Sequence, residues 1–153
     1  GIAIGRAITA RPELFAAAII TVGSANPLRT VGLAGDPGSL AEFGMMDTEE
    51  GFRALLAMDT YHQVQDGKPY PGVLLTTGVA DPRVIAWEPA KLAARLQAAT
   101  SSGRPVLLRV EFGDGAGLGS AEAQRQEELA DEMSFLLWQL GAQGFQPAGA
   151  DRP

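Results

Sequence analysis

The chain has 153 residues, 46% hydrophobic and 20% charged, a balance that fits one globular domain with a single core. Its net charge of −6 argues against non-specific nucleic-acid binding, and the lack of cysteine excludes disulfides, thiolate catalysis and cysteine-ligated zinc. No apolar run is long enough to span a membrane, so neither nucleic acid nor a membrane is an expected partner. We expect a cytoplasmic protein, with the periplasm as the alternative.

The first part of the chain predicts a helix, a strand and a long loop. Residues 2–10 read as a helix that Arg11-Pro12 ends. No capping residue or initiator methionine precedes this helix, so we expect the chain to be a piece of a larger fold. Residues 15–22 predict a buried strand. Residues 23–44 are glycine-rich and have no periodic pattern, which predicts a long loop of the kind that often carries function.

Strands and helices alternate along the rest of the chain. The predicted elements are a helix at 48–57 capped by Thr48, a strand at 73–77, a helix at 88–100, a strand at 106–112, a glycine-rich loop at 113–119 and a helix at 121–140. This order predicts an α/β fold with a parallel sheet and helices on both faces. Three strands leave an apolar edge exposed, which a missing N-terminal part or a second copy of the chain could cover. We expect one partial domain at 1–141 and a flexible tail at 142–153.

Reactive groups of an open parallel sheet gather at the carboxyl ends of its strands. Asp81 follows the second predicted strand directly, where a carboxylate can orient a catalytic imidazole. The loop after the third strand has four glycines between Gly113 and Gly119, which allows the backbone to approach another group closely. Spacing alone leaves open that both loops are simple turns.

Several separated blocks of sequence closely resemble the catalytic domain of the prolyl oligopeptidase family. The blocks are IGRAITARPELFAAAI, EFG with EEGFRALLAMDTYHQV, TTGVADPRV, ARLQAATSSGRPVLLRVEF, GLGS and FLLWQLG. They occur in the family's order and spacing from Gly1 to about Gly141. The resemblance implies the C-terminal portion of an α/β-hydrolase domain, whose catalytic serine, aspartate and histidine occur in that chain order.

The resemblance also assigns roles to individual residues. Gly1 matches the last glycine of the nucleophile elbow, so the serine would lie upstream of this chain. Asp81 matches the catalytic acid, and Arg83 matches the arginine that holds the substrate's backbone carbonyl. Ala116 stands where the family has histidine, and alanine cannot transfer a proton.

The family's proline pocket is only partly matched. Its tryptophan would fall near Ser39, whereas Phe43 keeps an aromatic side chain close by, as a substrate-binding candidate. The resemblance therefore supports proline specificity less well than it supports the catalytic role of Asp81.

Other polar and aromatic residues have simpler interpretations. His62 is the single histidine of the chain and lies far from the expected base loop, so we assign it a structural role. One histidine without cysteine makes a metal site improbable, and the implied chemistry needs no cofactor. Trp87 and Trp138 are expected in the core or an interface rather than in ligand stacking.

The sequence and the resemblance thus predict a serine peptidase that cleaves peptide bonds after proline, represented here by a piece that is inactive alone. Its expected partners are a peptide substrate and the upstream part of the same protein. Two alternatives stay open. One is a non-catalytic interaction module that pairs with another chain, or with a second copy of itself, through the open sheet edge. The other is an esterase of the same fold.

Overall fold

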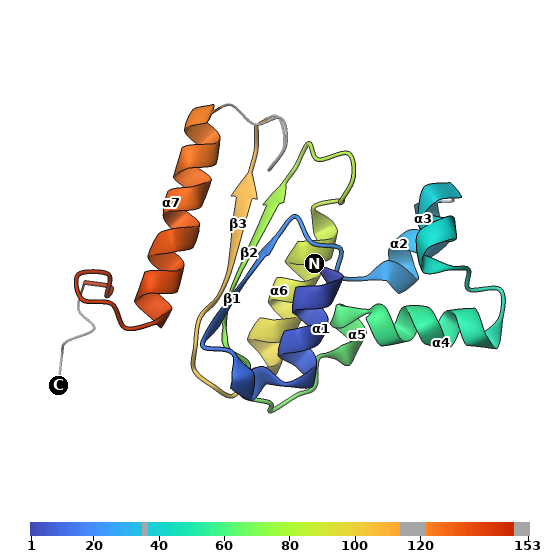
Figure 1. Cartoon of the computed structure of the whole chain (residues 1–153), viewed down its shortest axis with the longest axis horizontal. Helices are drawn as coiled ribbons and strands as arrows, with labels where there is room; N and C mark the ends of the chain where they lie inside the picture. Colours follow the sequence, from blue (N-terminus) through green and yellow to red (C-terminus); the bar gives the residue numbers. More distant parts are fainter. Residues whose placement is uncertain (35–36, 114–121, 149–153) are drawn as a thin grey trace.

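The computed structural model describes residues 1–34, 37–113 and 122–148, without the side chains of residues 32–34 and 37–39 (Figure 1). Its centre is a parallel sheet of strands β1 (Ala17–Thr21), β2 (Gly72–Gly78) and β3 (Val106–Glu111), in that order across the sheet. Both strand pairs are parallel, and each is joined by a helical crossover. The predicted parallel sheet is confirmed, with β1 and β3 at its edges.

Helices cover both faces of this sheet, as predicted. Helix α1 (Ile2–Ala10) packs on β1, and α6 (Trp87–Ala99) packs on β2 and β3, with the short η1 turn (Pro12–Leu14) after α1. Helix α7 (Glu122–Gln139) lies on the opposite side of the sheet in Figure 1 and contacts β1 and β2. The fold is therefore the three-layered α/β arrangement that the alternating pattern indicated.

The core lies between the sheet and the α1/α6 layer. Side chains alternate along a strand, so Val73 and Leu75 of β2 enter this core whereas Leu74 faces the α7 layer. Strand β2 is buried along its whole length, which is consistent with its lack of any charged residue. The core cluster comprises Ile8, Ala18, Ile20, Ala25, Val64, Tyr70, Val73, Leu75, Leu92, Ala93, Leu96, Ala99 and Val106.

The prediction of a loop at 23–44 is wrong. This segment forms α2 (Pro27–Ala34) and α3 (Pro37–Phe43). The N–H of Leu28 in the first turn of α2 donates to Asp59 Oδ2 at 3.1 Å. Asn26-Pro27 is a local signal for a helix start, but the side chain of Asn26 bonds Asp59 and Lys91, and the oxygen that caps this turn comes from the distant Asp59.

Two further helices complete this region. Helix α4 (Glu49–Met58) begins as predicted, with Thr48 Oγ1 accepting from the N–H of Gly51 at 3.0 Å. The four-residue α5 (Thr60–Gln63) was not predicted; Asp59 is its N-cap and accepts from the N–H of His62 at 3.0 Å. Asp59 therefore caps α2 and α5 together and joins two segments that are separate in sequence.

The chain after α7 makes turns in its described part. Gly141 and Gly144 adopt φ values of +76° and +85°, a backbone region that glycine enters without strain. Gln146 donates to the backbone oxygens of Trp138 and Ala142, at 3.2 Å in each case. The division into a domain at 1–141 and a flexible tail at 142–153 stays a prediction.

Candidate active site

Asp81 lies just beyond the carboxyl end of β2, and its side chain is only 3% exposed. Its Oδ1 accepts from the backbone N–H groups of Arg83 and Val84, at 2.7 and 3.1 Å. Its Oδ2 accepts from the guanidinium of Arg83 at 3.2 Å. The residues that follow Asp81 thus fold back on it, as aspartate commonly arranges in turns, and fix the direction of its carboxylate.

These contacts also control the ionisation of Asp81. Burial by itself raises the pKa of this carboxyl, but the N–H groups of Arg83 and Val84 and the guanidinium of Arg83 together outweigh it. The pKa of Asp81 therefore lies below its ordinary value, because each donor favours the charged form. At neutral pH the residue is a carboxylate, the form that can stabilise an imidazolium.

A cavity of about 300 Å³ opens beside Asp81, between the loops that follow β1 and β2. The structure brings Arg83 and Phe43, which come from separate segments, to the walls of this one cavity. Most of the remaining lining is apolar, and the full lining consists of Ser24, Pro27, Thr30, Val31, Phe43, Pro82, Arg83, Val84, Ile85 and Glu88. A small apolar cavity with a few polar groups is the usual form of a ligand site.

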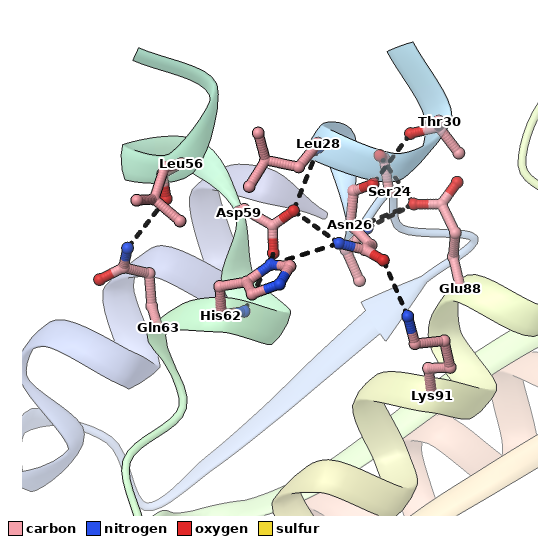
Figure 2. A network of polar contacts seen from close by, with 11 residues as sticks. Ser24, Asn26, Leu28, Thr30, Leu56, Asp59, His62, Gln63, Glu88 and Lys91 are labelled. Atoms are coloured by element: carbon pink, nitrogen blue, oxygen red, sulfur yellow. Dashed lines mark hydrogen bonds and ion pairs between the residues drawn. The ribbon is translucent and has the colours of Figure 1, made fainter. Parts of the chain in front are cut away.

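Glu88 is a polar wall of this cavity that the sequence reasoning missed. It is 2% exposed, and its Oε2 accepts from the Ser24 hydroxyl at 3.1 Å and from the N–H groups of Ala25 and Asn26 at 3.0 Å (Figure 2). The carboxylate therefore ties the loop after β1 to the start of α6 and sets the distance between two cavity walls. A glutamate in the first turn of a helix is ordinarily read as a favourable charge for that helix, which hid this role.

Ala116 lies outside the described residues. The loop that carries it leaves the sheet next to the loop of Asp81, since the N–H of Val79 donates to the carbonyl oxygen of Glu111 at 2.8 Å. The two loops thus start at adjacent strand ends, on the edge of the sheet where reactive groups gather.

His62 lies in a different network from Asp81. Its Nδ1 is 2.8 Å from Asp59 Oδ1 and 3.5 Å from Asn26 Nδ2 (Figure 2). Among residues 1–34, 37–113 and 122–148, no group of three or more histidine or acidic side chains could hold a metal ion. Within those same ranges, no helix is both long and apolar enough to cross a bilayer.

Comparison with known proteins assigns the fold to a family. The pattern of the prolyl oligopeptidase family matches residues 1–143. The chain belongs to the prolyl oligopeptidase family. It is 32% identical to the prolyl endopeptidase of Elizabethkingia meningoseptica over 142 residues, which are 92% of this chain and 20% of that protein. It is 29% identical to the prolyl endopeptidase of Dictyostelium discoideum, over 89% of this chain and 18% of that protein.

Solved structures of this family share the fold. A structure from a study of two prolyl endopeptidases superposes with a TM-score of 0.79 at 33% identity, over 92% of this chain and 19% of that one. Prolyl oligopeptidase B from Galerina marginata, bound to a 35mer hydrolysis and macrocyclisation substrate and carrying a histidine-to-alanine mutation, gives a TM-score of 0.82 at 26% identity, covering 92% and 20%. The chain spans about a fifth of the length of its curated relatives. The α/β-hydrolase resemblance is confirmed.

Proposed function

We propose that this chain is the acid-bearing part of a serine peptidase catalytic domain that hydrolyses peptide bonds after proline, and that the 153-residue polypeptide alone is inactive. The observation that carries the proposal is the ionised, firmly held Asp81 beside a cavity lined by Arg83 and Phe43. The chain belongs to a family that includes the prolyl endopeptidases compared above, and this membership supports peptide-bond hydrolysis as the reaction.

In this proposal Asp81 acts through an imidazole. An upstream serine attacks the scissile carbonyl carbon, a histidine takes the serine proton, and Asp81 stabilises the resulting imidazolium. The same imidazole then returns the proton to the leaving amine as the C–N bond breaks. It next takes a proton from water, which hydrolyses the acyl-serine ester and frees the serine. Ala116 occupies the histidine position and removes this base, and no nucleophile elbow is present in the chain. The reaction itself needs no metal or cofactor.

The cavity wall supplies the substrate contacts. The guanidinium of Arg83 is 57% exposed although it also bonds Asp81, so its remaining N–H donors can reach a peptide carbonyl oxygen. Phe43, Val84 and Ile85 provide an apolar surface suited to a proline ring. The residue before the scissile bond would thus lie in the cavity while Arg83 holds the backbone next to it.

The open edge of β1 provides the contact with the rest of the enzyme. Within the described part of the chain, β1 pairs on one side alone, with β2. We propose that an upstream strand of the same catalytic domain pairs with the other side, because an unpaired apolar edge strand is a liability in water. A homo-oligomer formed through this edge is the competing arrangement. We place the enzyme in the cytoplasm, with the periplasm as the alternative.

The test uses a restored enzyme, defined as this chain with Ala116→His joined behind the upstream part of the Elizabethkingia meningoseptica prolyl endopeptidase. We expect it to cleave a chromogenic peptide after proline and the 153-residue chain alone to leave that peptide intact. An ester of a small acyl group serves as the second substrate. Turnover of the ester without the peptide would favour an esterase and contradict the proposal.

Arg83 gives a sharper test of substrate binding in the restored enzyme. Arg83→Met removes a charge-assisted hydrogen bond, so kcat/KM should fall about 10- to 100-fold. Arg53→Met is the matched control, because Arg53 is an exposed arginine of α4 paired with Glu49. Equal losses in the two variants would show that Arg83 has no particular role in substrate binding.

A further inference from the structure

A second hollow, of about 390 Å³, lies on the other side of α2 from the candidate active site. We call it the His62 hollow, and it is lined by Asn26, Leu28, Arg29, Met46, Phe52, His62 and Lys91. Its described lining comes from α2 and the residue before it, from α4 and the segment before it, and from α5 and α6. Asn26 is a buried and firmly held part of this lining. It is 1% exposed, its Nδ2 donates to Asp59, and its Oδ1 accepts from Lys91.

Lys91 is held in place without a carboxylate partner. Its Nζ donates to Asn26 Oδ1 at 3.0 Å and lies 4.2 Å from the ring centre of Tyr61 and 5.3 Å from that of Trp87. None of the ion pairs found among the described residues involves Lys91 or the exposed Arg29. Two cations without an ion-pair partner among the described residues therefore border one hollow.

The two acids that are hydrogen-bonded to lining residues of the hollow, Asp59 and Glu88, are already engaged. Asp59 is fully buried, and its two oxygens accept from Asn26, from Leu28 and twice from His62. Glu88 accepts its hydrogen bonds on the other side of Asn26 (Figure 2). Neither of these two carboxylates is therefore free to meet a ligand in the hollow, whereas Lys91 and Arg29 line it directly.

The contact with Asp59 also orients His62. The Nδ1–H donates to Asp59 at 2.8 Å, which leaves Nε2 as the ring nitrogen available to a ligand, on a side chain that is 45% exposed. When the ring carries both protons, its Nε2–H can donate to a carboxylate in the hollow. His62, Lys91 and Arg29 then present donors from three different helices.

The rest of the lining is apolar and open to solvent. Met46 is 39% and Phe52 44% exposed, and Leu28 lies beside them. A bare inorganic anion would leave this surface uncovered, whereas an anion with an apolar group would cover it. We propose that the His62 hollow binds a carboxylate whose neighbouring group is apolar, held by Lys91, Arg29 and His62.

The test follows the imidazole of His62 by NMR in the 153-residue chain. Because His62 is the single histidine, its ring ¹⁵N and ¹H signals need no assignment by mutation. Titration with 3-phenylpropanoate should shift the Nε2 signal saturably, and the neutral 3-phenylpropanamide should not. A peptide ending in a free phenylalanine carboxylate, compared with its amide, tells whether a peptide terminus enters as readily as a free acid.

Variants assign the contacts. Arg29→Gln and Lys91→Gln should each weaken 3-phenylpropanoate binding about 10-fold or more, as expected for a lost charge-assisted hydrogen bond, whereas Arg53→Gln should not. Phe52→Ala should weaken 3-phenylpropanoate but leave acetate unchanged. Arg29 and Phe52 are exposed, so these two variants keep the test valid even if Lys91→Gln is poorly folded. Equal shifts from the amide, equally strong binding of inorganic phosphate, or unchanged affinity in Arg29→Gln would overturn the proposal.

Discussion

Asp81→Asn is expected to lower kcat of the restored enzyme about 10,000-fold, with little change in KM. Asparagine has nearly the same shape as aspartate, so the turn that Arg83 and Val84 make with it can persist. It lacks the negative charge that stabilises the imidazolium, and its amide can hold the imidazole in the wrong tautomer. The loss therefore falls on the chemical step rather than on binding.

Steady-state kinetics on the chromogenic proline peptide measures this effect. Asp66→Asn is the control, since Asp66 is 79% exposed and pairs with Arg95 on the surface. Comparable melting temperatures would show that both variants are folded. A kcat for Asp81→Asn within a few-fold of the parent would remove Asp81 from the catalytic group.

Asp59→Ala is expected to lower the free energy of unfolding of the 153-residue chain by about 3 kcal/mol or more. Asp59 is fully buried and accepts four hydrogen bonds, two of which cap α2 and α5. Alanine leaves these donors without their acceptor, and the amide of Asn26 among them is buried, at 1% residue exposure. Such a loss is a large share of the stability of a typical domain.

Urea unfolding followed by circular dichroism gives this free energy. Asp66→Ala is the matched aspartate variant and should cost less than about 1 kcal/mol, because exposed ion pairs contribute little. If the two variants were equally stable, the hydrogen bonds by which Asp59 caps α2 and α5 would not contribute to stability as proposed.

The sequence predicted the sheet and most of the helices because these elements carry strong local signals. Strand β2 is an uncharged segment with the apolar run Val73–Leu75 at its start, and Thr48 caps α4 from the adjacent position. The prediction failed for α2, whose first turn is capped by an oxygen 31 residues away in sequence. It also failed for α5, which is too short to show a helical period.

The candidate site divides in the same way. The position of Asp81 after a predicted strand was enough to make it a candidate. The roles of Asp81, Arg83, Phe43 and Ala116 came from the family resemblance. Glu88 escaped notice because its partners lie 62 to 64 residues earlier in the chain. No local pattern distinguishes a glutamate that joins two loops from one that faces solvent at a helix start.

We propose that the replacement of histidine by Ala116 is what removes the general base from this catalytic domain. The most direct measurement compares kcat/KM on the proline peptide for two forms of the joined polypeptide, one with Ala116 and one with Ala116→His, matched for melting temperature. We predict that the Ala116→His form is faster by a factor of about 1,000 or more, since the base and the nucleophile act as a unit. Equal rates, or no hydrolysis by either folded form, would contradict the assignment of position 116 to the general base.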